Sequence, residues 1–212
     1  MFQPLYYFPS VYAFADLLQS SNHFFDIDLP FKRSSFRNRM IIAAADGPIQ
    51  LSIPVVGGRS IRSIYREVHI DYKSHWQRDH FRTLSTAYGN SPFFMFYRDE
   101  LENLYSETPP LLYKWNLMCL EWIFKKIKLD FKIDDRQFSH DDLRPSFRSD
   151  KYFPQNYNML KAVLWVRYKQ VFEEKIGFLP NLSILDLLFN EGPSSKQVLL
   201  NIQSKLSSIS VV

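Results

Sequence analysis

The segment FKRSSFRNR, from Phe31 to Arg39, concentrates the side chains that are best suited to holding an anion. It contains four cations and no acid within nine residues. Guanidinium groups form paired, fork-shaped contacts with phosphate and carboxylate groups, which a lysine ammonium cannot do. The amide of Asn38 lies between Arg37 and Arg39 and adds donors and an acceptor. The segment therefore predicts either an anion-binding site or a solvated, charged loop.

The positive charge of the chain is confined to one region. The whole chain carries +4 at pH 7, with a sequence pI of about 9.0. Residues 32–66 alone carry +6, because seven cations oppose only Asp46, so the rest nets −2. These cations are Lys32, Arg33, Arg37, Arg39, Arg59, Arg62 and Arg66. The regional excess favours a phosphate-bearing small molecule, a nucleotide-sugar or an acyl donor, as the partner.

The opening QPLYYFP, residues 3–9, directly precedes a predicted helix. Backbone N–H groups at a helix start favour anions, and Gln3 and Tyr6 could complete such a site. The same ring-rich segment could equally pack on the core as a terminal plug. Both interpretations stay open.

Imidazole titrates near neutrality, so His80 is the first choice for a proton-transfer group. A half-buried structural histidine is the alternative. His75 and His80 are five residues apart and do not share a helical face. No spacing rule brings His69 to them, so we expect no metal site.

The tail GFLPNLSILDLLFNEGP places Asn181, Asp186 and Asn190 among leucines and isoleucines. Asp186 and Asn190 are four residues apart and face the same way on a helix. A carboxylate in apolar surroundings is usually paired or functional. Asp186 is therefore either the salt-bridge partner of an arginine in the basic segment or a catalytic carboxylate. We expect both groups to converge around one hollow, where Asn181 and Asn190 would bind substrate.

Composition sets the class of the protein. A chain of 212 residues with 46% hydrophobic content can bury a sizeable core as a single domain. Cys119 is the single cysteine, which excludes an intramolecular disulfide, fits a reducing compartment and suits core packing. No apolar run approaches the ~20 residues of a membrane span, so we expect a cytoplasmic protein. No glycine-rich phosphate loop, nucleophile elbow or metalloprotease motif is present, and the sequence leaves the cofactor unknown.

Periodicity and turn signals divide the chain into elements. Helices are predicted at 11–21 with Ser10 as cap, at 74–89 with Ser74 as cap, at 91–107 and at 109–129. Two more are predicted within 179–206, with Asn181 or Ser183 as start and Gly192-Pro193 as break. Strands are predicted at 23–30 and 64–71, with a hairpin over 39–56 that turns at Asp46-Gly47.

Strands early and helices late predict an α/β or α+β fold, in which a small N-terminal mixed sheet is covered by a helical C-terminal half. We expect one domain over residues 1–212. Its parts would be a strand-rich part at 1–72, a helical part at 73–131, a polar loop or lid at 132–154 and C-terminal helices at 155–212.

Four blocks of the sequence together resemble the WbqC-like protein family. They are QPLYYFP, KRSSFRNR with its hairpin to SIPV, HIDYKSHWQRDHFRTLSTAYGNSPFF and GFLPNLSILDLLFNEGP. The resemblance runs from Gln3 to about Pro193. Family members usually carry an apolar strand before the first block, whereas only Met1 and Phe2 precede Gln3 here. The family is bacterial and is associated with O-antigen and other surface polysaccharides.

The resemblance implies a transferase that moves an acyl or aminoacyl group, including glycyl, onto an activated sugar. In this interpretation Lys32, Arg33, Arg37 and Arg39 hold anionic groups, and His80 moves a proton. Asn181 and Asp186 orient the partner. Two other functions stay open, a nucleic-acid binder that stacks bases between arginines and a non-catalytic scaffold in a biosynthetic complex.

Overall fold

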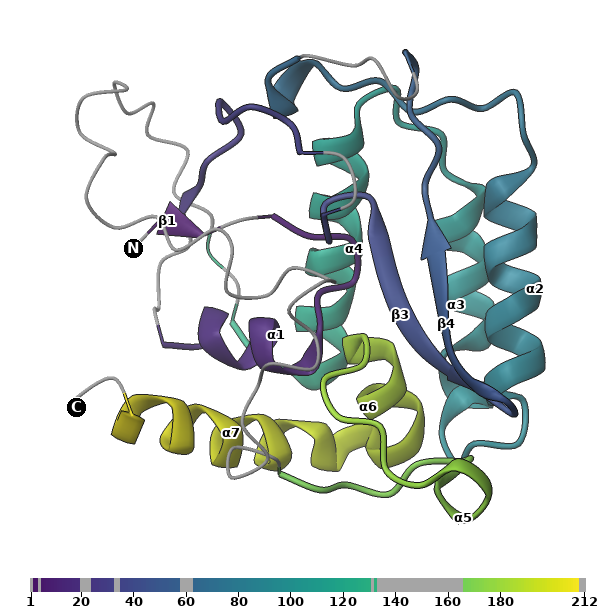
Figure 1. Ribbon diagram of the computed structural model, residues 1–212, viewed down its shortest axis with the longest axis vertical. Coiled ribbons are helices and arrows are strands. Elements are labelled where there is room, and N and C mark those ends of the chain that lie inside the picture. Colours follow the sequence, from purple (N-terminus) through teal and green to yellow (C-terminus); the bar gives the residue numbers. More distant parts are fainter. Residues whose placement is uncertain are drawn as a thin grey trace.

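The computed structural model describes residues 2–3, 5–19, 24–32, 35–57, 63–130, 132 and 166–209. Within these residues the chain is α+β, because its short strands, all within the first 52 residues, form two small pairs and most of its helices follow them (Figure 1). This confirms one of the two predicted classes. The α/β alternative would need strands that alternate with helices in one parallel sheet.

The strands form two separate pairs. β1 (Phe2–Gln3) pairs in parallel with β2 (Phe24–Phe25), and β3 (Arg39–Ala44) pairs antiparallel with β4 (Gly47–Ser52). The predicted hairpin is confirmed, but its turn lies one residue earlier than expected. Ala44 faces Gly47 in the register, so Ala45 and Asp46 form the loop, and Gly47 supplies the positive φ of 127°.

The predicted strand at 64–71 is wrong, because residues Tyr65–Glu67 form the 3-10 helix η2. Tyr65 and Val68 are both fully buried and are three residues apart, which is the period of a 3-10 turn and not of a strand. The Tyr65 hydroxyl donates to the Leu5 carbonyl at 3.1 Å. This long-range contact turns the ring into the core.

Three helices form the right and central parts of Figure 1: α2 (Trp76–Tyr88), α3 (Phe94–Ser106) and α4 (Leu112–Ile127). The predicted Ser74 cap is wrong, since His75 is the N-cap of α2 and makes no side-chain capping bond. Cys119 is fully buried on α4, as its apolar neighbours predict. None of the helices among the described residues is long and apolar enough to span a membrane.

The tail forms a short helix and two longer ones: α5 (Glu173–Ile176), α6 (Ile184–Glu191) and α7 (Ser195–Ile209). The predicted start at Ser183 is confirmed, because its hydroxyl accepts from the Leu185 amide. The predicted break is the 3-10 turn η6 (Gly192–Ser194). α7 runs below α1 (Val11–Leu17), which Ser10 caps as expected (Figure 1). The predicted loop at 132–154 lies outside the described residues, apart from Lys132.

Three irregular segments, 54–56, 68–71 and 109–112, lie side by side. Single bridges join Val55 to Ile70 and His69 to Leu111. The amide of Ile70 donates to the Pro110 carbonyl at 2.9 Å. These bonds hold the segment before α2 against the segment between α3 and α4.

Candidate functional site

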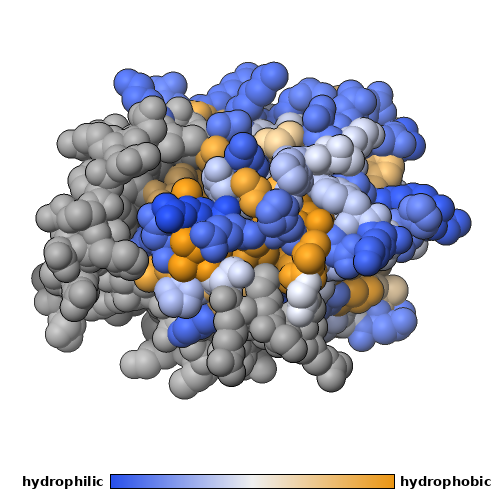
Figure 2. Space-filling view, turned by 90° about the horizontal axis from the view of Figure 1, so that it is seen from above, coloured by the Kyte–Doolittle hydropathy of each residue, from blue (hydrophilic) through white to orange (hydrophobic). Residues whose placement is uncertain are grey.

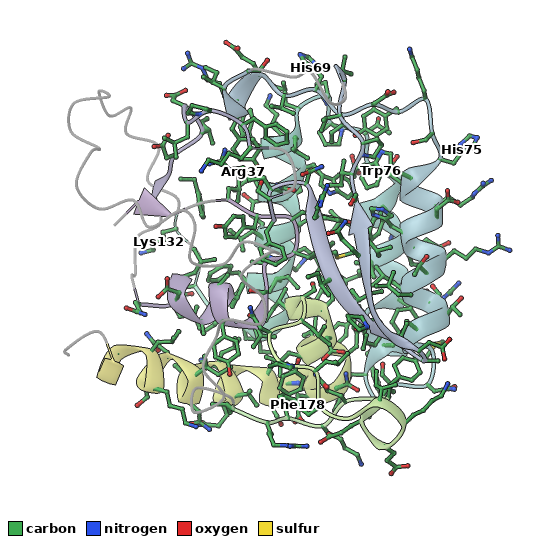
Figure 3. All side chains as sticks on the ribbon, in the orientation of Figure 1. Arg37, His69, His75, Trp76, Lys132 and Phe178 are labelled. Atoms are coloured by element: carbon green, nitrogen blue, oxygen red, sulfur yellow. The ribbon has the colours of Figure 1, made fainter. Side chains whose placement is uncertain are left out.

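A hollow of about 1000 Å³ opens where α2 begins and α3 ends. Two imidazoles, one guanidinium and one carboxylate contribute to its wall: His69, His75, Arg78 and Glu102. Hydroxyl groups and aromatic rings complete it, from Tyr72, Ser74, Phe81, Ser106 and Thr108. Figure 3 shows His69 at the upper end of the molecule and His75 at the start of α2. Figure 2 looks onto that end, where hydrophilic side chains border an apolar area.

The hollow is held open by side chains that bind the end of α3. The Gln77 side-chain amide donates to the carbonyls of Tyr105 and Glu107, both at 2.6 Å. These carbonyls belong to the last turn of α3 and the residue after it, where no further helical N–H group is available to donate to them. The Tyr72 hydroxyl donates to the Pro109 carbonyl at 2.8 Å. The start of α2 is therefore fixed against the end of α3.

His80 lies behind this wall and is only 6% exposed. Its Nδ1 lies 3.0 Å from the Tyr7 hydroxyl, which in turn lies 2.5 Å from the Tyr105 hydroxyl. Burial lowers the pKa of His80 from 6.5 to about 4, although a hydrogen bond to the Ser52 backbone and the nearby Asp79 oppose this. The imidazole is therefore neutral at pH 7.

The hydrogen bond of His80 to Tyr7 joins two buried groups. Burial raises the pKa values of Tyr7 and Tyr105 well above 10, so both phenols stay neutral. His80 thus reaches the hollow only through Tyr7 and Tyr105, and Tyr105 contributes to the wall.

Arg37 points into the protein. Its Nη1 donates to the Pro30 carbonyl at 2.9 Å, and its guanidinium carbon lies 4.9 Å from the centre of the Tyr65 ring. Burial lowers the pKa of Arg37, while electrostatic interactions with Tyr65, Tyr6 and Asp26 raise it. The side chain therefore stabilises the core and does not line the hollow.

Asn38 and Arg39, which follow Arg37, make hydrogen bonds across the β3–β4 hairpin. The buried Asn38 amide donates to the Ile53 carbonyl at 3.1 Å and extends the β3–β4 ladder by one residue. Arg39, at the start of β3, donates to the Gln50 side chain at 3.3 Å. Lys32 is exposed. Arg33 lies outside the described residues.

The opening segment does not leave a free helix start. The Val11 amide donates to the Leu182 carbonyl at 2.8 Å, and the Tyr12 amide donates to the Asn181 side chain at 3.1 Å. The first turn of α1 is therefore satisfied by the tail, which removes the predicted anion site. Tyr6 is buried with its ring 6.1 Å from that of Phe36. Only the backbone of Gln3 is described, and it belongs to β1.

Asp186 is fully buried and accepts three hydrogen bonds from neutral groups. They come from the hydroxyls of Tyr88 at 2.8 Å and Tyr168 at 2.7 Å, and from the Gln170 amide at 3.1 Å. Burial raises the pKa of Asp186 from 3.8 to about 6, while these bonds lower it. The predicted ion pair between Asp186 and an arginine is not found among the described residues. Asn190 donates to the Asp186 carbonyl at 2.7 Å within α6.

The structure does not bring Arg37 and Asp186 together. Arg39 opens β3, whereas the Tyr88 hydroxyl that binds Asp186 accepts from the amide of Ala43. Four residues of strand separate these points, which is about 13 Å. In Figure 3, Arg37 lies in the upper half, and Phe178, whose ring packs on Tyr168, lies near the lower edge. The predicted common hollow is therefore absent from the described residues.

Sequence reasoning missed most of the hollow. The signal was present in residues 69–78, which contain two histidines, an arginine, a glutamine and a tyrosine within ten positions. Their mixture follows neither a helical nor a strand period, because residues 71–75 form an irregular turn and only Trp76 begins α2. The described residues contain no group of three or more histidine, cysteine or acidic side chains that could hold a metal ion.

Comparison with known proteins identifies the family. The model of the WbqC-like protein family matches residues 3–142. Neither a curated protein nor a solved structure matches the chain significantly. The matched range contains every residue of the hollow together with Tyr7 and His80, and it ends before Asp186. Because the match covers well over half of the chain, this protein belongs to the WbqC-like family.

Proposed function

We propose that this protein transfers an acyl or aminoacyl group, such as glycyl, onto an activated sugar in surface-polysaccharide biosynthesis. Membership of a family associated with polysaccharide biosynthesis supports the pathway. The observation that carries the proposal is the hollow itself, which combines exposed imidazoles, a guanidinium, hydroxyls and aromatic rings at one end of the molecule. The substrate would carry phosphate.

The lining suits an activated sugar. Hydroxyls and amides can exchange hydrogen bonds with sugar hydroxyls, and the faces of Tyr72 and Phe81 offer apolar surface to a sugar ring. The Arg78 side chain is 70% exposed and pairs only loosely with Asp79 at 3.6 Å, so it can meet a phosphate. Ligand pockets combine apolar walls with a few such polar groups.

The reaction needs a group that accepts a proton from the attacking hydroxyl or amine. His75 and His69 are exposed in the hollow and would serve as that base, then return the proton to the leaving group. His80 would act behind them, through Tyr7, by fixing the position of Tyr105. This assigns proton transfer to different histidines from the one that the sequence favoured.

Calorimetry with nucleoside diphosphate sugars, and with pyrophosphate as the minimal probe, tests the proposal. Arg78→Ala is expected to weaken binding by about tenfold or more, because hydrogen bonds to charged groups contribute about 1.5–3 kcal/mol. Lys196→Ala removes an equal charge from the exposed side of α7 and is the matched control. Equal affinities for both variants and the parent protein would refute the assignment of the hollow.

The nucleic-acid alternative loses one of the arginines on which it depends. It requires arginines of the basic segment to meet phosphates at the surface. Arg37 instead lies over the Tyr65 ring and is 5% exposed. We therefore keep the transferase as the single proposed function.

A further inference from the structure

Asp186 is a buried carboxylate without a cationic partner among the described residues. It is 0% exposed, and its three donors are the phenols of Tyr88 and Tyr168 and the amide of Gln170. A negative charge that leaves water for the protein interior loses hydration, and neutral donors restore only part of it. The ionisation of Asp186 therefore changes the strength of its contacts with the two phenols and the amide.

These contacts attach one particular segment, residues 166–179. Tyr168 and Gln170 provide two of the three bonds to Asp186. Gln170 also donates to the Leu179 carbonyl at 2.8 Å and accepts from the Leu179 amide at 2.9 Å. The carboxylate is thus the buried point at which Tyr168 and Gln170 hold this segment to α6, and Gln170 in turn binds the far end of the segment at Leu179.

We propose that Asp186 is a pH-sensitive latch, which holds residues 166–179 against α2 and α6 and releases them more readily when its carboxyl group is ionised. Detachment of Tyr168 and Gln170 would open Asp186 to water, which solvates the ionised form far better than the neutral form. The protonated carboxyl can remain docked, because its O–H can donate to a phenol oxygen. The latch is independent of the proposed transferase function.

The groups around Asp186 support this assignment. α2 presents Tyr88, and the segment presents Tyr168 and Gln170. β3 contributes the Ala43 amide, which binds the Tyr88 hydroxyl. α1, α3 and α7 also pack on α6, but the described part of these helices offers no charged group to the carboxylate. Burial raises the pKa of Asp186 to about 6, so its ionisation in the docked state falls near neutral pH.

Other ionisable contacts of the segment lie nearer the surface. The Lys169 amide donates to the Glu191 carboxylate at 3.0 Å, and Lys175 pairs with the exposed Asp46 at 3.1 Å. Arg167 pairs with Glu173 inside the segment itself. Glu191 is the matched control, because its carboxylate contacts the same segment but remains partly exposed.

Hydrogen exchange of the intact protein, expressed as protection factors, tests the latch. The Leu179 amide reports docking through Gln170, because its acceptor is the Gln170 side chain that also donates to Asp186, and the amides of α4 report global unfolding. The protection factor of Leu179 is expected to fall on the order of tenfold between pH 5 and pH 8, with α4 as internal reference. Glu191→Gln should keep this fall, and Asp186→Asn should remove it.

A flat Leu179 profile in the unmodified protein, or an unchanged slope in Asp186→Asn, overturns the latch. Tyr168→Phe provides a second variant that retains the carboxylate but removes one donor to it. It should lower Leu179 protection most at pH 8, where the ionised carboxylate depends on that donor. Equal loss at pH 5 and pH 8 would indicate a purely structural tyrosine and would also overturn the proposal.

Discussion

At the scale of single residues, polar side chains inside this protein mostly satisfy backbone groups. Asn181 accepts from the Tyr12 amide in the first turn of α1, and Ser183 donates to the Phe8 carbonyl at 3.0 Å. Asn116 donates to the Arg37 carbonyl at 2.6 Å. Each contact joins segments that are far apart in sequence. Asn181 and Ser183 therefore join the tail to the N-terminal segment, and Asn116 joins α4 to the basic segment.

Asn181 is the most sensitive of these positions, because it combines the helix cap with a φ of 56°. Asn181→Ala is expected to lower the free energy of unfolding by about 2–3 kcal/mol, from the lost cap and the left-handed backbone together. Asn181→Gly should cost about 1 kcal/mol, since it removes only the cap. Urea denaturation measures both, and a larger loss in the glycine variant would contradict this account.

At the scale of elements, the junction of α6 and α7 depends on close approach to the start of α3. Gly192 ends α6 with a φ of 51°, and a Cβ at this position would lie 2.4 Å from the Phe93 ring. The Phe93 amide donates to the Phe189 carbonyl at 3.0 Å, which fixes that ring near the junction. Gly177, which ends α5, has a φ of 77° but no atom within 4 Å of a Cβ.

The two glycines form a matched pair for a mutational test. Gly177→Ala is expected to destabilise the protein by about 1–2 kcal/mol through backbone strain alone. Gly192→Ala should cost about 1–3 kcal/mol more, because the Phe93 ring must also move. Chemical denaturation compares the variants. Phe93→Leu should recover part of the loss in Gly192→Ala but not in Gly177→Ala, and equal losses in the two alanine variants would exclude the steric term.

At the scale of the whole molecule, two buried groups give stability opposite dependences on pH. The folded-state pKa of His80 is below its usual value, so its contribution is present above pH 6.5 and is lost as pH falls toward 4. The folded-state pKa of Asp186 is above its usual value, so its cost is present above pH 6 and is relieved as pH falls toward 3.8. The two effects oppose each other between pH 6 and pH 4.

Each effect amounts to about 3 kcal/mol, because one pKa unit corresponds to about 1.4 kcal/mol. Relative to the parent protein, Asp186→Asn is therefore expected to lose stability on acidification from pH 7 to pH 4.5, as the His80 term is left unopposed. His80→Gln should gain stability over the same range. Urea midpoints at the two pH values provide the measurement. Parallel profiles for both variants would show that these groups do not titrate as their burial requires.

The sequence predicted the helices well and the directions of side chains poorly. The helices at 76–88, 94–106 and 112–127 follow apolar residues at three- and four-residue spacing, which is a signal that can be read from the sequence alone. The prediction of a strand at 64–71 was wrong because the Tyr65 hydroxyl is held inside the protein. It donates to the Leu5 carbonyl and accepts from the Asn116 side chain. Arg37 is directed inward for the same reason, since the Tyr65 ring and the Pro30 carbonyl receive its guanidinium.

Local periodicity and turn signals by themselves predicted the helices, the hairpin and the burial of Cys119, because these depend on neighbours along the chain, and four blocks of sequence carried the resemblance to the WbqC-like family. The structure decided between the α/β and α+β classes, because strand pairing joins separate segments. Tertiary structure decided the rest. It buried His80 and Asp186 with phenols from distant segments and gathered His69, His75 and Arg78 around a hollow. Burial and hydrogen-bond partners set the charge and accessibility of a side chain, and both are fixed only when remote segments pack together.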